Sequence, residues 1–340
     1  MPTLCSLFGL HPHLKSFTIS FFSNLVFCKL LNFLTPVHYS IYKTNKKLFL
    51  KHLPVCGIII GKMNYFERAK YFKTKKRLGQ NFLIDGQAIS DIIDFADIQP
   101  DDTVIEIGPG VGFVTEQLVK HAKQVIAIEL DEQAIKELEK LNAPNLKIIH
   151  NDILKQDLSE LCEGKVKIVA NIPYYITSPI IAHLLGEIDD LDNKNRNKIT
   201  DILLMVQEEV ARRMVADENS PSKQYGLLTI LSQFWADVEI VRLVGRKSFY
   251  PAPKVNSAVV KLRVREKPLL ELSDYSHFRK TIKSAFSQRR KNIKNCLLSG
   301  GFAKENIQKA LAKLGLDENL RGEKLSIETF GALSEALNEN

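Results

Sequence analysis

The residues Thr103-Val-Ile-Glu-Ile-Gly-Pro-Gly-Val-Gly112 decide the fold of this chain. The first five are mostly apolar and β-branched, which predicts a short buried strand. Glycine then follows at three alternate positions, where the strand would turn into a helix. Such glycines let the backbone approach a ligand closely, and the N-terminus of the helix exposes N–H groups. The stretch by itself also fits a tight packing turn, so its surroundings must decide between the two hypotheses.

Short β-branched runs alternate with helical segments around this stretch, and we find no internal repeat. The predicted strands are 103–107, 124–129, 146–150, 167–170 and 202–206, and the predicted helices include 86–96, 113–121 and 131–141, the last capped by Asp131. Strands separated by helices are typical of a parallel sheet that is covered on both faces. The fold class is therefore α/β.

The character of the chain changes after Val264, where only helical patterns remain. Residues 275–298, 303–313 and 326–337 are predicted helices, separated by glycines. We place a boundary between 266 and 273. The sequence thus predicts an α/β domain over 63–268 and a smaller C-terminal helical domain over 269–340.

Acidic residues follow the second and third predicted strands. Glu129 lies 21 residues beyond Gly108, where a carboxylate could accept both hydroxyls of a ribose, and Asp152 could accept from an adenine amino group. Each acid taken singly also fits a surface residue or a helix cap. The glycine loop and two acids at successive strand ends together predict a nucleoside site. A nicotinamide enzyme is disfavoured, because Phe113 stands where the dinucleotide fingerprint has a third small residue.

The fourth predicted strand is followed by Asn171-Ile-Pro-Tyr174. An exocyclic adenine nitrogen is a poor nucleophile, so a site that modifies it must hold its hydrogens and clamp its ring. The side-chain oxygen of Asn171 and the carbonyl of Ile172 could accept those hydrogens, and the Tyr174 ring could stack on the base. The alternative is that the tetrapeptide is merely a strand exit ended by proline.

Five motifs together resemble one known family, the ribosomal RNA adenine dimethyltransferases of the KsgA/RsmA type. The resemblance runs in order from about Lys73 to the C-terminus. The motifs are Arg77-Leu-Gly-Gln-Asn-Phe-Leu83, the Glu106 glycine loop, Asn171-Ile-Pro-Tyr174, Phe249-Tyr-Pro-Ala-Pro-Lys-Val-Asn-Ser-Ala258 and Phe286-Ser-Gln-Arg-Arg-Lys-Asn292.

The resemblance implies a Rossmann-like class I methyltransferase domain that uses S-adenosyl-L-methionine (AdoMet). It implies dimethylation at N6 of two adjacent adenines near the 3′ end of small-subunit (16S) rRNA, during small-subunit biogenesis. Asn171, Tyr174 and Phe249 would be the catalytic residues, with the two rings enclosing the base. The implied cofactor-binding residues are Asn81, Leu83, Gly108, Glu129, Asp152 and Asn171. Two alternatives remain, an Erm-type enzyme of large-subunit rRNA and a ribosome-assembly factor in which catalysis is secondary.

The formal charge of +8 does not by itself indicate nucleic-acid binding. Residues 1–62 hold seven Lys and no acid, which leaves 40 basic residues (47 − 7) against 39 acidic ones in the rest of the chain. Affinity for RNA must therefore come from local patches. One precedes the cofactor motif (Arg68, Lys70, Lys73, Lys75, Lys76 and Arg77), and a second is predicted on one C-terminal helix (Arg279, Lys280, Lys283, Arg289, Arg290, Lys291 and Lys294). We assign RNA binding to Arg289, Arg290 and Lys291.

Residues 1–62 differ from the remainder and have no counterpart in the family pattern. There are three interpretations of this segment. It could target the protein to a compartment, or it could be an additional structural element. The third, which we favour, is that it is an upstream extension outside the native protein, or a disordered segment, and that Met63 is the true start. Cys162 and Cys296 are far apart, and the histidines show no ligand spacing, so neither zinc nor a disulfide framework is indicated. We expect a cytoplasmic monomer without a metal or a membrane span, bound to rRNA in a pre-ribosomal small subunit.

Overall fold

The structure, a computed structural model, describes residues 64–75 and 78–339. The interpretations of residues 1–62 and of the start at Met63, and the basic residues Lys76 and Arg77, lie outside the described residues. The elements are α5 (Tyr65–Tyr71), β1 (Phe82–Leu83), α6 (Gly86–Ala96), β2 (Thr103–Ile107), α7 (Thr115–His121), β3 (Gln124–Glu129), α8 (Glu132–Leu138), β4 (Leu146–His150), β5 (Val166–Asn171), α9 (Thr177–Leu185), β6 (Ile199–Gln207), α10 (Glu208–Met214), α11 (Leu227–Trp235), β7 (Ala236–Val244), β8 (Phe249–Tyr250), β9 (Ser257–Val264), α12 (Tyr275–Ala285), α13 (Ile293–Ser299), α14 (Lys304–Lys313) and α15 (Ile327–Asn338).

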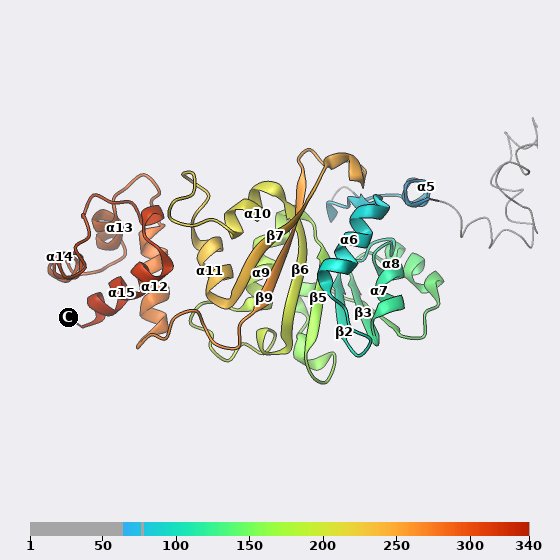
Figure 1. Cartoon of the computed structure of the whole chain (residues 1–340), viewed down its shortest axis with the longest axis horizontal. Coiled ribbons are helices and arrows are strands. Elements are labelled where there is room, and N and C mark those ends of the chain that lie inside the picture. The colour runs from blue at the N-terminus through green and yellow to red at the C-terminus, as the bar shows by residue number, and fades with distance from the viewer. Residues whose placement is uncertain (1–63, 76–77, 340) are drawn as a thin grey trace, which may run out of the picture. The chain divides into compact units, whose positions relative to one another are not determined.

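A mixed sheet forms the centre of the described residues, with seven strands in the order β4-β3-β2-β5-β6-β9-β7 (Figure 1). From β4 to β6 each strand is parallel to the next one in this order, and Ile105 of β2 lies opposite Ile126 of β3 and Ile168 of β5. The α/β, Rossmann-like fold is confirmed. The five predicted strands are parallel, as expected. The sequence analysis did not predict β7 and β9, and β9 runs antiparallel to both β6 and β7. No long helix joins β7 to β9, so the chain has no crossover with which to return in the parallel sense.

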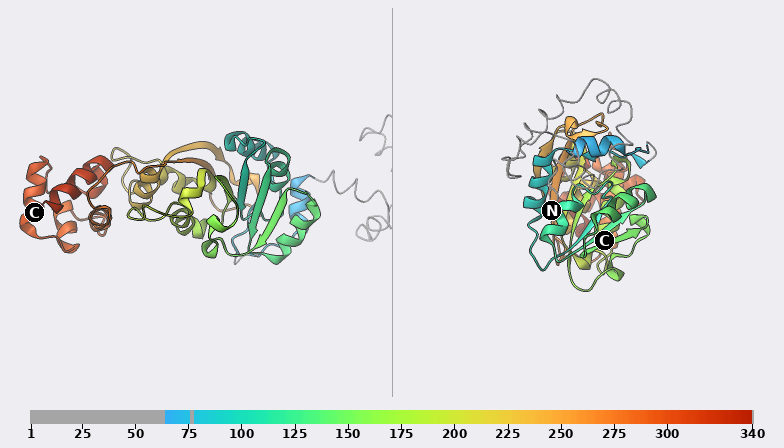
Figure 2. Two further views of the ribbon diagram at one scale, coloured as in Figure 1. Left: turned by 90° about the horizontal axis from the view of Figure 1, so that it is seen from below. Right: turned by 90° about the vertical axis from the view of Figure 1, so that its right-hand side faces the viewer.

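Both faces of the five inner strands, β3, β2, β5, β6 and β9, are mostly buried, whereas most residues of the edge strands β4 and β7 are partly or fully exposed. Val104 and Val125 point into a cluster with α6 and α7, whereas Ile105 and Ile126 point into a cluster with α9 and α11. Figures 1 and 2 show these helices over the sheet. Because successive strand residues point to opposite faces, one alternating pattern supplies both cores. The carboxyl edge of the sheet remains as the place for a ligand.

Among the C-terminal helices α12 to α15, the prediction of one helix over 275–298 is wrong. Residues 275–298 do not form one helix: α12 ends at Ala285, and Asn292 caps α13 by accepting a hydrogen bond from Asn295 N at 2.9 Å. The turn lets α13 pack back on α12, so that a Cβ at Gly300 would overlap Ser284 Oγ. A continuous helix could not make this contact.

The apolar core continues from the sheet into the C-terminal helices, through Phe278, Ile282 and Leu333. Contact of α12 with the rest of the protein is also ionic, since Arg279 Nε lies 2.8 Å from Glu187 Oε2. The domain boundary between 268 and 269 stays a prediction; β9 ends at Val264 and α12 begins at Tyr275. No helix of the described residues has the length and apolarity to cross a membrane.

Candidate active site

A pocket lies at the carboxyl ends of β2, β3, β4 and β5, and the segment 78–83 forms another of its walls. The carboxyl ends of parallel strands meet at one edge, which brings distant residues together. All six predicted cofactor-binding residues line this pocket: Asn81, Leu83, Gly108, Glu129, Asp152 and Asn171. Of the three predicted catalytic residues, Asn171 and Tyr174 line it and Phe249 does not.

The glycine loop needs glycine for two separate reasons. Gly108, Gly110 and Gly112 have φ values of 68°, 57° and 82°, which L side chains rarely adopt. A Cβ at Gly110 would in addition lie 2.7 Å from the Phe82 ring. The loop also explains why α7 begins at Thr115, two residues after the predicted start. At Gly108 and Gly110 the backbone of this loop therefore borders the pocket without a side chain.

Glu129 is held at the end of β3 by the backbone around it. Its Oε2 accepts from Gly110 N at 2.9 Å, and its Oε1 accepts from the N–H groups of Leu130 and Asp131, both at 2.8 Å. The side chain is almost fully buried, and burial raises its pKa above the ordinary value despite these hydrogen bonds. Each carboxylate oxygen has more than one lone pair, so Glu129 can still accept from a ligand hydroxyl.

Asp152 lines the pocket and also caps a short helical turn. Its Oδ1 accepts from Leu154 N at 3.0 Å, and its own N–H donates to Asn151 Oδ1 at 2.8 Å. The cap orients the carboxyl group at the end of β4. The capping role that the sequence left open is therefore observed, while the predicted role toward adenine stays a prediction.

The segment 78–83 contacts the end of β5 across the pocket. Asn171 Nδ2 donates to the Asn81 carbonyl at 3.4 Å, and Asn81 Nδ2 donates to the Gly79 carbonyl at 3.0 Å. Leu83 is buried and pairs with Phe249 in the two-stranded β1–β8 sheet. The pairing ties two sequence motifs that lie 166 residues apart (249 − 83) to one wall of the site.

Tyr174 and Phe249, the predicted walls around the base, have different environments. Tyr174 is half-buried, and its hydroxyl lies 2.6 Å from Ser257 Oγ; burial raises its pKa. Phe249 is 3% exposed, within an apolar cluster that contains Phe82 and Met205. A role for Phe249 against a base stays a prediction, and it would require the ring to become accessible.

Glu106 is a pocket residue to which sequence reasoning assigned no role. It is buried, and its Oε2 accepts from Thr115 Oγ1 at 2.6 Å. Burial raises its pKa to about 8, which the hydrogen bond from Thr115 only partly opposes. The available signal was an acid within the mostly apolar strand 103–107, one residue before its end.

We expect this glutamate to make the stability of the protein depend on pH. Because its folded-state pKa lies above the ordinary glutamate value, its contribution is full below about pH 4 and is lost as the pH rises through about 8. Glu106→Gln should remove that dependence. Urea unfolding of both proteins between about pH 5 and pH 8 measures it. Parallel curves for the two proteins would contradict a raised pKa at Glu106.

The predicted RNA-binding residues Arg289, Arg290 and Lys291 are exposed in the turn between α12 and α13. They were expected on a helix, which is wrong. Within residues 64–75 and 78–339 none of them forms an ion pair. Five other basic residues of the two patches are in ion pairs: Arg68–Glu116, Lys75–Asp131, Arg279–Glu187, Lys283–Glu187 and Lys294–Glu318. The turn therefore presents to phosphates three exposed cations that form no ion pair with a described residue. Arg289 also donates to the Lys223 carbonyl at 3.5 Å, and Lys280, which likewise pairs with no described acid, lies over the Phe302 ring.

The sheet, the glycine loop and the acids at adjacent strand ends define a Rossmann-like class I methyltransferase. Within that class, the chain belongs to the ribosomal RNA adenine dimethylase family, whose model matches residues 71–339. AdoMet is the cofactor of this chain, and its activity is AdoMet-dependent methyl transfer.

Similar proteins agree with this membership. Proteins called ribosomal RNA small subunit methyltransferase A from Clostridium botulinum (strain ATCC 19397 / Type A) and Clostridium acetobutylicum are 44% identical over 272 and 270 residues, covering 78% of this chain and 94% of each relative. Among solved structures, the 23S rRNA methyltransferase ErmE has a TM-score of 0.59 at 30% identity, covering 76% of this chain and 100% of ErmE. A dimethyladenosine transferase from Plasmodium falciparum has a TM-score of 0.60 at 29% identity, covering 73% and 94%.

Proposed function

We propose that this protein dimethylates N6 of two adjacent adenines near the 3′ end of small-subunit rRNA. It would act as a cytoplasmic monomer on a pre-ribosomal small subunit. One observation carries the proposal: Asn171 and Tyr174 line the same pocket as Gly108, Glu129 and Asp152. The relatives named as small-subunit methyltransferases support the choice of rRNA.

The described residues fit AdoMet in this pocket. The loop presents only backbone to the pocket at Gly108 and Gly110. Glu129 offers carboxylate oxygens to the ribose hydroxyls, and Asp152 offers an acceptor to the adenine amino group. Asn81 and Leu83 would cover the site from the segment 78–83. When bound, AdoMet supplies a methyl group that is already activated on a positively charged sulfur.

The protein's task is then to position and desolvate the acceptor nitrogen. Asn171 Oδ1 and the Ile172 carbonyl would accept its two hydrogens, which aims the nitrogen lone pair at the methyl group. Within the described residues, Asn171 Oδ1 accepts no hydrogen bond and is available for this role. Tyr174 would stack on the target adenine after that base has left the stacked RNA. We assign no general base.

The structural likeness to ErmE favours one alternative, an adenine of large-subunit rRNA. Incubating the full chain with labelled AdoMet and either unmethylated small subunits or large subunits separates the two. We expect label at two adjacent adenines of the small-subunit RNA, mapped by mass spectrometry of nuclease fragments. Label confined to large subunits would support the alternative, and label in neither would reject the proposal.

The turn between α12 and α13 should attach the enzyme to the subunit. Arg289→Ala with Arg290→Ala should weaken binding and lower the salt dependence of log K by about one for each phosphate that is no longer neutralised. Affinity for AdoMet should not change. Lys304→Ala with Lys309→Ala removes the same charge from α14 and serves as control. Binding to small subunits at two salt concentrations measures both pairs, and equal effects of the two would argue against a specific role for the turn.

A further inference from the structure

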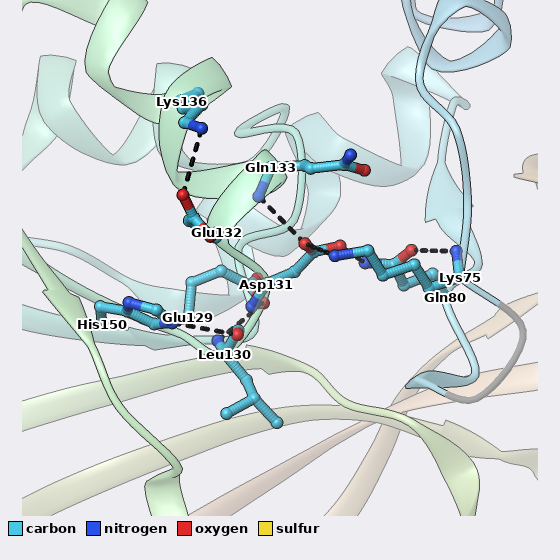
Figure 3. Close-up of polar contacts among 9 residues, drawn as sticks. All are labelled: Lys75, Gln80, Glu129, Leu130, Asp131, Glu132, Gln133, Lys136 and His150. Carbon is cyan, nitrogen blue, oxygen red and sulfur yellow. Dashed lines mark hydrogen bonds and ion pairs between the residues drawn. The ribbon is translucent and has the colours of Figure 1, made fainter.

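Asp131 has more hydrogen-bond partners than its role as a helix cap requires. Its Oδ1 accepts from Gln133 N at 3.0 Å, which caps α8. The same oxygen accepts from Lys75 Nζ at 2.6 Å, and its Oδ2 accepts from Gln80 Nε2 at 2.7 Å (Figure 3). The Asp131 side chain has no exposed surface. A cap needs only the first of these bonds, so the other two call for another explanation.

One of the two additional donors, Gln80, belongs to the segment 78–83 that forms a wall of the pocket, and the other, Lys75, lies five residues before it. Lys75 and Gln80 precede Asp131 by 56 and 51 residues. Gln80 lines the pocket beside Asn81, and its Oε1 accepts from Lys75 N at 2.8 Å. Both ends of the Gln80 amide are therefore used, and its orientation is determined by one acceptor and one donor (Figure 3).

Asp131 is also connected to the opposite wall of the pocket. Its backbone N–H donates to Glu129 Oε1 at 2.8 Å. Burial alone would raise the pKa of Asp131, but the hydrogen bonds from Lys75 and Gln80 outweigh it and hold the pKa below the ordinary value. The residue is thus a charged, buried acceptor that joins the end of β3 to the segment 78–83.

We propose that Asp131 is a positioning residue for the cofactor: through Gln80 and Lys75 it holds the segment 78–83 in place, and so sets the affinity for AdoMet. The inference rests on the proposed placement of AdoMet in this pocket. The physical reason is preorganisation. A wall that is ordered before the ligand arrives costs no conformational entropy on binding, whereas a loose wall must be ordered at that moment.

Two single substitutions and their combination, which exchange the carboxylate of Asp131 with the amide of Gln80, separate this role from capping. Asp131→Asn keeps an oxygen for the cap, because asparagine caps helices as well as aspartate does. The asparagine Nδ2 then takes the place of Oδ2 and faces Gln80 Nε2, so that two donors oppose each other. Gln80→Glu instead sets two carboxylates against each other. In the double variant the new amide faces the new carboxylate, and every hydrogen bond of the network can form again.

In the full chain, each single substitution should raise the Kd and KM for AdoMet about tenfold, with kcat at saturating AdoMet changed by less than about threefold. The double variant should return to within about threefold of the original Kd. Asp274→Asn, the same change at the cap of α12 far from the pocket, should leave the Kd unaltered. Lys75→Met also raises the Kd; it removes a partly exposed donor and keeps Asp131, so it tests the network even if an Asp131 variant fails to fold.

Two outcomes would overturn the proposal. One is that Asp131→Asn, Gln80→Glu and Lys75→Met all leave the Kd for AdoMet unchanged, whatever happens to the melting temperature. This result would mean that Asp131 acts only as a helix cap. The other is that the double variant binds no better than the singles. Glu129→Ala distinguishes a failure of the proposed site: if it too leaves AdoMet affinity unchanged, the proposed placement of the AdoMet ribose at Glu129 is wrong, and the result does not count against Asp131.

Discussion

Replacing Asn171 with alanine should lower the single-turnover rate of methyl transfer by roughly 10² to 10³, the scale on which one preorganised hydrogen bond acts in a transition state. Asn171 ends β5 and lines the pocket, and its side chain is oriented by donation to the Asn81 carbonyl at 3.4 Å. That contact leaves its oxygen to orient the acceptor amino group. Binding of small subunits should change far less than the rate.

Asn171→Asp is the matched variant, because it keeps an oxygen acceptor and loses the donor to Asn81. It should retain more of the rate than Asn171→Ala. Single-turnover methylation and subunit binding are measured for both variants. Near-normal turnover in Asn171→Ala would mean that the proposed active site is wrong, whatever the family membership.

Glu129→Ala should weaken AdoMet binding by about 1.5 to 3 kcal/mol, or about tenfold to a hundredfold. The substitution removes the predicted acceptor for the ribose hydroxyls. It also leaves the N–H groups of Gly110, Leu130 and Asp131 without their shared acceptor, which loosens the glycine loop. Isothermal titration calorimetry measures the affinity, and circular dichroism verifies that the fold is retained.

Glu132→Ala is the control for this result. Glu132 is an exposed acid three residues further on, paired with Lys136 at 3.1 Å outside the pocket. Its loss should not alter AdoMet affinity. Equal affinities for the original protein and Glu129→Ala would remove Glu129 from the ribose site.

Strands in the first half of the sheet were predictable because their patterns are local. The structure places β2, β3 and β4 at the predicted bounds 103–107, 124–129 and 146–150. Each is a short apolar run between turn residues, and each is followed by a residue that the pocket uses. The parallel arrangement follows from the helices between them, since a parallel neighbour requires a crossover.

Elements in the second half were harder to predict, for a common reason. The sequence analysis predicted neither β7 nor β9, and the antiparallel direction of β9, like the break in 275–298, depends on what the chain packs against. An alternating apolar pattern does not distinguish parallel from antiparallel pairing. The pattern of 275–298 likewise continues across residues 286–292, and the close contact of Gly300 with Ser284 requires the turn.

The sequence by itself determined which chemical groups stand at the strand ends: a glycine loop at Gly108, acids at Glu129 and Asp152, and an amide at Asn171. These groups follow from position alone, because the carboxyl ends of parallel strands converge on one edge. Only the tertiary structure decided which charges are paired and which rings are covered. Lys75 was predicted to face RNA and instead meets Asp131, 56 residues away, while Phe249 is packed in an apolar cluster. Such partners are selected by three-dimensional proximity and desolvation, and no local pattern in the chain records either of them.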